Sequence, residues 1–148
     1  MPFFILHGDI TTLKVDAIGD SFHHISNIHK YARAEDVPAH TLFVITTDGM
    51  ENASRTYSAR EIKRRIKQQK EQFGWEFLFV GANIDAVKSA DRFGIAPDRA
   101  VTYHADRRGT RVVYECLNRA VGSFRANAPT EVDWSDEIAA DFNRRTHC

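Results

Sequence analysis

The chain has little of several features that mark specialised protein classes. Its 148 residues include only two cysteines, Cys116 and Cys148, whose spacing fits neither a disulfide framework nor a CxxC metal site. Twenty basic residues balance twenty acidic residues, so no net field attracts nucleic acid or an anionic membrane. No apolar run approaches the roughly 20 residues of a membrane span, and no secretory leader pattern opens the chain. We therefore expect a cytoplasmic protein that binds neither nucleic acid nor membrane.

What the chain does contain is an alternation of apolar segments typical of an α/β domain. Apolar runs at residues 3–6, 42–45, 75–80 and 100–103 indicate strands, the first two of them continuous as in strands buried on both faces. Apolar residues recur at helical spacing in residues 18–28, 58–73, 85–94 and 113–124. Crossovers of this length join parallel strands. The sequence predicts one domain over residues 1–148, a small three-layer Rossmann-like α/β fold with a mostly parallel sheet of about four strands.

Local signals refine the helices of this domain. Ser58-Ala-Arg-Glu61 is a capping box, which opens a helix that Gly74 closes. The apolar face predicted for this helix consists of Ile62, Ile66, Gln69 and Phe73. The tail over residues 126–148 is polar, but its four large apolar residues predict that it docks on the domain; they are Val132, Trp134, Ile138 and Phe142.

Polar residues follow each predicted strand, at the edge of an open parallel sheet where ligands bind. They are His7, Gly8, Asp9, Thr11 and Thr12; Thr46, Thr47, Asp48, Gly49, Glu51 and Asn52; Gly81, Asn83 and Asp85; and His104 and Asp106. Most of them offer oxygen ligands, which hard cations such as Mg²⁺ prefer. The spacing contains no Ser-His-Asp order, nucleophile elbow or carboxylate pair, so we expect a protein that is not an enzyme.

The strongest resemblance is to a von Willebrand factor A (vWA) domain. The block Phe43-Val-Ile-Thr-Thr-Asp-Gly-Met-Glu-Asn-Ala-Ser54, followed by Gly74-Trp-Glu-Phe-Leu-Phe-Val-Gly-Ala-Asn-Ile-Asp-Ala86, resembles the C-terminal half of a bacterial vWA-like family. The resemblance covers about residues 16–148 and implies a truncated vWA-like fold.

The vWA resemblance also implies a metal-ion-dependent adhesion-type site. Asp48 in the Thr-Asp-Gly loop matches the aspartate after the family's central strand, and Thr12 falls where the family's threonine stands. The family's Asp-x-Ser-x-Ser loop is absent, and Asp9 in Asp9-Ile10-Thr11 offers a partial replacement. We therefore expect an incomplete site that binds Mg²⁺ weakly.

The first 18 residues, MPFFILHGDITTLKVDAI, resemble instead the opening strand and loop of a macro domain. That family binds ADP-ribose, and the resemblance implies that Asp9, next to Gly8, bonds to the adenine amino group. Asn83, after the third strand, is a further candidate ligand residue. The family's Gly-rich phosphate loop is missing, so too few groups converge to give affinity.

Two further groups of residues are typical of a protein surface and a protein core. A basic helix could meet nucleic acid, but Glu61 and Glu71 interrupt it and no aromatic residues interleave, which favours a solvated face. Its basic residues are Arg60, Lys63, Arg64, Arg65, Lys67 and Lys70. Cys116 lies on the apolar side of the last predicted helix, which is typical of a core residue.

We expect a non-enzymatic vWA-like interaction module with an unknown protein partner. The alternatives are a nucleotide or ADP-ribose binder that uses the macro-like loop, and a metal-dependent hydrolase built on Asp9 and Asp48. In vWA folds the first strand lies inside the sheet, so residues 3–7 would become an open edge here. An apolar edge without lysine or a mid-strand proline is a template for pairing, which predicts a homodimer through this strand. In the alternative, the tail covers the edge and the chain is a monomer.

Overall fold

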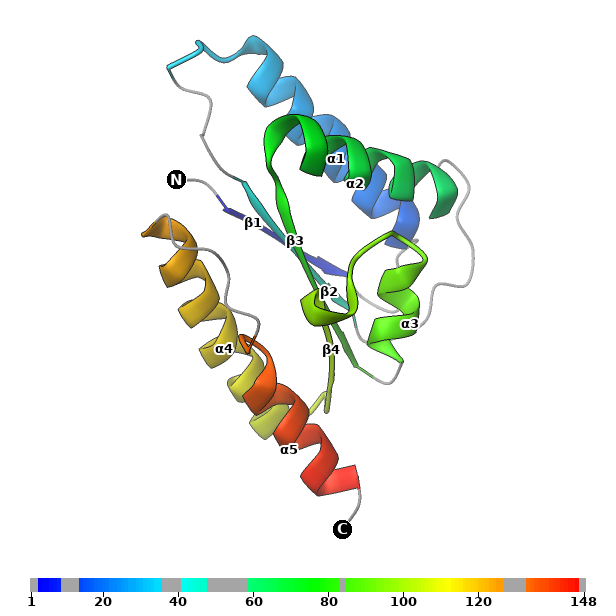
Figure 1. Cartoon of the computed structure of the whole chain (residues 1–148), viewed down its shortest axis with the longest axis vertical. Coiled ribbons are helices and arrows are strands. Elements are labelled where there is room, and N and C mark those ends of the chain that lie inside the picture. The colour runs from blue at the N-terminus through cyan, green and yellow to red at the C-terminus, as the bar shows by residue number, and fades with distance from the viewer. Residues whose placement is uncertain are drawn as a thin grey trace.

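Four parallel strands form one sheet, and they lie side by side in their order along the chain (Figure 1). They are β1 (Phe3–Gly8), β2 (Leu42–Thr47), β3 (Glu76–Ala82) and β4 (Ala100–Tyr103). The structure is a computed structural model, and it describes residues 3–8, 14–35, 41–47, 59–82, 85–126 and 133–146. For residues 3–8, 14–18, 22 and 59 it describes only the backbone.

Helices occupy the connections between the strands and the C-terminal part of the described chain. They are α1 (Lys14–Tyr31), α2 (Ala59–Phe73), α3 (Ala86–Asp91), the 3₁₀-helix η1 (Pro97–Arg99), α4 (Arg107–Arg125) and α5 (Asp136–Thr146). The predicted α/β class with a parallel sheet is confirmed, and the layout fits a Rossmann-like arrangement. α4 begins earlier than its apolar residues indicate, because Asp106 caps it and its first turn is polar.

The strand order decides which face of the sheet each helix covers. Each connection from one strand to the next moves one place in the same direction across the sheet. Parallel crossovers are right-handed, so α1, α2 and α3 all lie on one face. No described strand follows β4, and α4 and α5 cover the opposite face (Figure 1). The result is a three-layer structure.

Two hydrophobic clusters hold these layers together. On one face, Phe43 and Phe77 pack with Ile62 and Ile66 of α2. On the other face, the next residues along the strands, such as Val44, pack under α4 and α5. This alternation follows from the two-residue period of a strand. β2 and β3 therefore contribute to both clusters, as strands buried on both faces must.

The apolar face of α2 is shorter than the sequence indicates. Ile62 and Ile66 are fully buried, but Phe73 is 59% exposed, so its assignment to the buried face is wrong. Phe73 is the last residue of the helix, and the chain turns away immediately after it. Gly74 makes this turn with a φ of 66°, a conformation that favours glycine, and its N–H donates to Lys70 O at 3.2 Å.

Among the helices of the described residues, none combines the length and the apolar character needed to cross a membrane.

The first turn of α4 packs so closely on the end of β4 that it has room only for glycine. A Cβ added to Gly109 would lie 1.9 Å from the His104 carbonyl oxygen. We expect Gly109→Ala to destabilise the fold by about 2 kcal/mol or more, because backbone must move to make room. Gly122→Ala is the matched control, since nothing lies within 4 Å of its added Cβ. That variant should gain about 0.5–1 kcal/mol from helix propensity. Urea unfolding measures both, and equal stabilities would contradict the close packing.

Candidate functional site

The carboxyl ends of the four strands lie level with one another. The register places Gly8 opposite Thr47, Thr47 opposite Gly81, and Gly81 opposite Thr102. Loops that leave this edge therefore start at a similar height across the sheet. This is the edge at which open parallel sheets bind their ligands.

At the β1 and β2 end of this edge, the structure describes only part of the predicted site. Gly8 is the last residue of β1. Asp9, Thr12, Asp48 and Asn83, the other residues of the predicted cation and ligand sites, lie outside the described residues. Thr47, which directly precedes Asp48, is 3% exposed. The threonine of the Thr-Asp-Gly loop is thus the buried last residue of β2.

At the β3 and β4 end, the helices leave the sheet on opposite faces. α3 follows β3 onto one face and α4 follows β4 onto the other (Figure 1). Such a divergence creates a crevice in doubly wound sheets. Here a hydrogen bond ties the start of α3 to β4, since Thr102 Oγ1 accepts from the Ala86 N–H at 3.0 Å. Asp85 is also engaged, because its Oδ1 accepts from the Lys88 N–H at 3.1 Å and caps α3.

Asp106 caps α4 in the same way and also binds α5. Its Oδ1 accepts from the Gly109 N–H at 2.7 Å. Arg145 of α5 binds the same carboxylate with two nitrogens: Nη1 donates to Oδ2, and Nη2 donates to Oδ1 at 3.1 Å. A two-point pair of this kind fixes orientation as well as distance.

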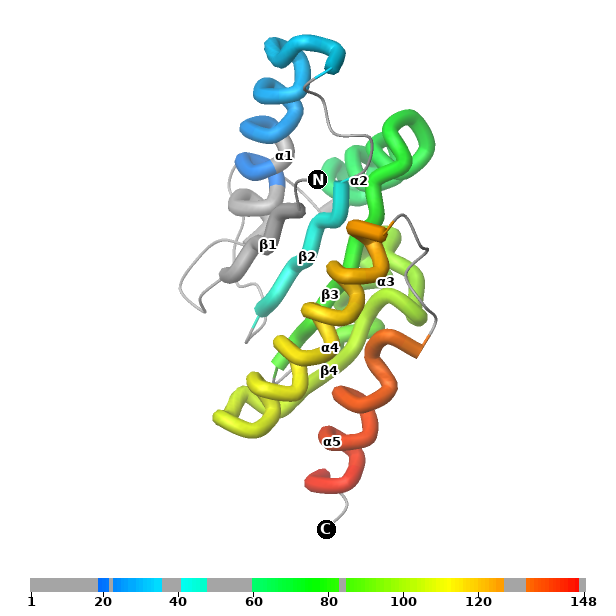
Figure 2. Tube along the Cα trace, turned by 90° about the vertical axis from the view of Figure 1, so that its left-hand side faces the viewer, coloured from blue at the N-terminus to red at the C-terminus, as the bar shows by residue number. Residues whose placement is uncertain are grey.

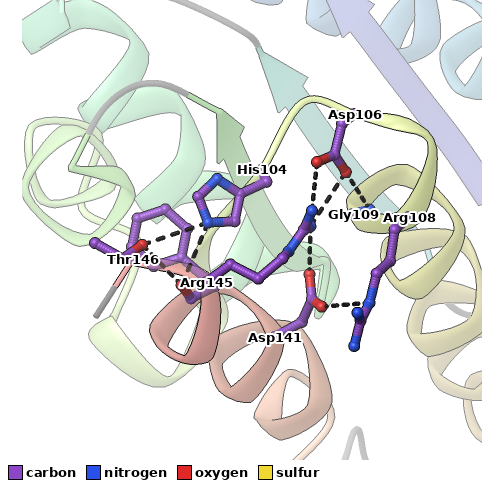
Figure 3. A network of polar contacts seen from close by, with 8 residues as sticks. His104, Asp106, Arg108, Gly109, Asp141, Arg145 and Thr146 are labelled. Atoms are coloured by element: carbon purple, nitrogen blue, oxygen red, sulfur yellow. Dashed lines mark hydrogen bonds and ion pairs between the residues drawn. The ribbon is translucent and has the colours of Figure 1, made fainter. Parts of the chain in front are cut away.

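Asp141 extends these contacts into a four-residue polar network (Figure 3). It is 3% exposed, although carboxylates are rarely buried without a partner. Its Oδ2 accepts from Arg145 Nη2 at 2.6 Å. Its Oδ1 lies 3.0 Å from Arg108 Nε in an ion pair, but it accepts no hydrogen bond within the described chain. The network joins the start of α4 to the end of α5 and is made of Asp106, Arg108, Asp141 and Arg145.

His104 binds α5 from the end of β4. Its ring stacks on Phe142, with centroids 4.6 Å apart and an angle of 29° between the planes. Its Nε2 lies 3.3 Å from both the Phe142 carbonyl oxygen and Thr146 Oγ1. The Thr146 hydroxyl also donates to the Phe142 oxygen at 2.7 Å. The candidate ligands His104 and Asp106 are thus both held by contacts within the chain.

The other end of α5 is anchored by Trp134. The indole Nε1 donates to the Asp98 carbonyl oxygen at 2.7 Å, and the side chain is 7% exposed. Figure 2 shows α5 beside α4 and β4. In the strand order, β4 lies at the opposite end of the sheet from β1. The alternative in which the tail covers the first strand is therefore wrong for residues 133–146.

Sequence reasoning missed the ionic part of this arrangement. Asp141 and Arg145 stand four residues apart on one helix, which is the spacing of a helical ion pair. That signal was present, but nothing local showed that Arg145 also reaches Asp106. The arrangement fixes α5 on α4, and its two carboxylates are both engaged in holding the helices together.

The described residues do not form a metal centre by themselves. They contain no group of three or more His, Cys, Asp or Glu side chains that could hold a metal ion. The predicted cation site depends on Asp9, Thr12 and Asp48, which lie beyond the described ranges.

Cys116 is a core residue, as its place on the apolar side of the helix predicts. It is 1% exposed, and burial raises the pKa of its thiol. The Arg119 side chain links this cysteine to α5. Its Nη2 lies 3.3 Å from the Cys116 Sγ, and its Nη1 donates to Glu137 Oε1 at 2.9 Å.

No protein-family model, curated protein or solved structure matches the chain.

Acid should weaken the attachment of α5. The hydrogen bond from Arg145, followed by that from the Gly109 N–H, lowers the pKa of Asp106 to about 2. In the unfolded chain an aspartate has a pKa of about 3.9. The pKa is lower in the folded state, so this carboxylate contributes its full stability above about pH 4. That contribution is lost as the pH falls toward about 2. Asp106→Asn should therefore flatten the dependence of stability on pH in this window.

Urea unfolding at several pH values, followed by tryptophan fluorescence, measures this dependence. Asp85→Asn is the matched control, because it removes a helix-capping carboxylate that has no arginine partner among the described residues. If both variants flatten the dependence equally, Arg145 is not its cause.

Proposed function

We propose that the chain is a non-enzymatic vWA-like protein-interaction module, a truncated vWA-like fold that binds its partner through the edge of β1. One observation carries this proposal. β1 is the outermost strand of the sheet and, among the described strands, pairs only with β2.

The edge of β1 has the properties of a backbone-pairing surface. An edge strand presents a row of unpaired N–H and C=O groups to another chain. The six residues of β1, FFILHG, contain neither lysine nor proline, which are the residues that commonly protect such an edge. The described tail lies at the other side of the sheet, where α5 packs beside β4. This edge therefore favours pairing with a further strand.

The position of β1 also supports the vWA resemblance. In vWA folds the first strand neighbours the central strand, which precedes the conserved aspartate. β1 pairs in parallel with β2, and Asp48 follows the last residue of β2 directly in sequence. Under this proposal β1 takes the place of the family's first strand, and its outer side is open to pairing among the described strands.

The simplest partner for this edge is a second copy of the chain. Two β1 strands can pair antiparallel across a two-fold axis and extend the two sheets into one. We expect light scattering at micromolar concentration to give twice the 16.9 kDa mass of one chain. Hydrogen exchange should then show protection at all β1 amides, including those that point away from β2. A monomeric mass, with fast exchange at alternate β1 amides, would rule out this dimer.

The module also carries an incomplete cation site, built from Asp48 with Thr12 and Asp9. The matched ends of β1 and β2 support this grouping, because Gly8 and Thr47 are register partners and each directly precedes one of the two aspartates. We expect Mg²⁺ to bind weakly, since few carboxylates leave the ion largely hydrated. Asp48→Ala should abolish the calorimetric heat of Mg²⁺ binding, whereas Asp98→Ala, an exposed control on η1, should retain it. Equal heats in wild type and Asp48→Ala would remove Asp48 from the site.

The two alternatives have less support. Binding of ADP-ribose and metal-dependent hydrolysis both require Asp9, and hydrolysis also requires Asp48. No contact of the described residues favours either activity over protein binding.

A further inference from the structure

One face of α2 carries a row of positive charge, which we call the α2 basic stripe. Each member lies three or four residues from at least one other member, so they share one side of the helix. They are Arg60, Lys63, Arg64, Lys67 and Lys70. All five are exposed, and they extend over about 15 Å of helix axis at ~1.5 Å per residue. The stripe faces away from the apolar side of the helix, where Ile62 and Ile66 enter the core.

The charges of the stripe are not neutralised within the described chain. None of its five members forms an ion pair with another described residue, whereas Arg99, Arg108, Arg119 and Arg145 all do. Like charges three or four residues apart destabilise a helix. Repulsion between its members therefore reduces the stability of α2, and no ion pair of a stripe residue within the described chain offsets this. An external anionic partner would offset this repulsion.

A groove of about 200 Å³ lies along the same side of α2. It is lined by Lys63, Lys67, Lys70, Glu71 and Gly94. Gly94 forms part of its wall, and a Cβ added there would lie 3.2 Å from Lys63 Cγ. The aliphatic part of the Lys63 side chain thus packs along the wall, while its ammonium group is free to reach an anion. The groove has room for one apolar side chain, and its charged lining consists of three lysines and one glutamate.

We infer that the α2 basic stripe and its groove bind an acidic protein segment, with carboxylates along the stripe and one apolar side chain in the groove. Charge complementarity supports an anionic partner, and the groove supports a protein side chain. Nucleic acid fits less well, because the stripe contains no aromatic residue for stacking and the chain has no net positive charge. This inference rests on the proposed role as an interaction module, but it uses a different surface from β1.

Fluorescence anisotropy with a fluorescein-labelled, glutamate-rich peptide that contains one central leucine tests this assignment. The double variant Lys63→Glu/Lys67→Glu should bind this peptide at least about tenfold more weakly, because two attractive contacts become repulsive. The control Arg107→Glu/Arg111→Glu makes the same change in net charge on α4, on the opposite face of the sheet, and should bind like wild type. Binding should also weaken as salt is raised to about 0.15 M and above. Circular dichroism and light scattering on each variant check the fold and the mass.

The outcomes separate this inference from the dimer. If only the stripe variant loses peptide binding and its mass is the same as that of wild type, the stripe is the binding surface. This holds whether the protein is a monomer or a dimer. Failure of wild type to bind the peptide at low salt, or equal loss in both double variants, overturns the assignment. Tighter binding of single-stranded DNA or of phosphatidylserine vesicles than of the peptide, through the same lysines, also overturns it in favour of that partner.

Discussion

The direction in which the chain crosses the sheet is the constraint on which the other features depend. Each of the three crossovers between β1 and β4 moves one strand further in the same direction. Right-handed crossovers then place α1, α2 and α3 on one face, so the opposite face is left to α4 and α5. The same constraint makes β1 an edge strand and makes the helices after β3 and β4 diverge. This direction of crossing therefore accounts for the two clusters of the core. It also accounts for the open edge at β1 and for the position of α5 beside β4.

The polar edge of the sheet illustrates how helix caps compete with ligands for the same residue types. Asp85 and Asp106 stand where ligand residues of an α/β protein are expected, and both instead bind N–H groups at the start of a helix. A helix start needs acceptors for its free N–H groups, and aspartate supplies them. Asp141 and Arg145 then connect one of these caps to α5. At the β3 and β4 end of this edge, the aspartates therefore stabilise helix starts and the packing of α5 on α4.

The sequence was sufficient for the elements that depend on local pattern. The run Ala100–Tyr103 is the strand β4 without any shift, because a short apolar run between polar turns is typical of a strand. The helix α5 was harder to predict. Its apolar residues indicated that the tail docks on the domain, but not that it does so as a helix. The burial of Asp141 could not be predicted, since a carboxylate is expected at the surface unless its partner is known. One partner of Asp141, the arginine Arg145, is close to it in sequence. The position of the Arg145 side chain, however, depends on its hydrogen bonds to Asp106, 39 positions earlier in the chain. For the cation site, the structure adds the level ends of β1 and β2, which directly precede Asp9 and Asp48 in sequence.

The match between strand order and chain order also has a consequence for how the sheet can assemble during synthesis. Each strand pairs with the one made just before it, so no strand has to wait for a distant segment. The sheet can grow by addition at one side as the chain leaves the ribosome, with each helix covering the same face in turn. The opposite face stays uncovered until α4 is made. The nascent chain therefore carries an exposed apolar surface, formed by residues such as Val44 and Leu78, until α4 is made.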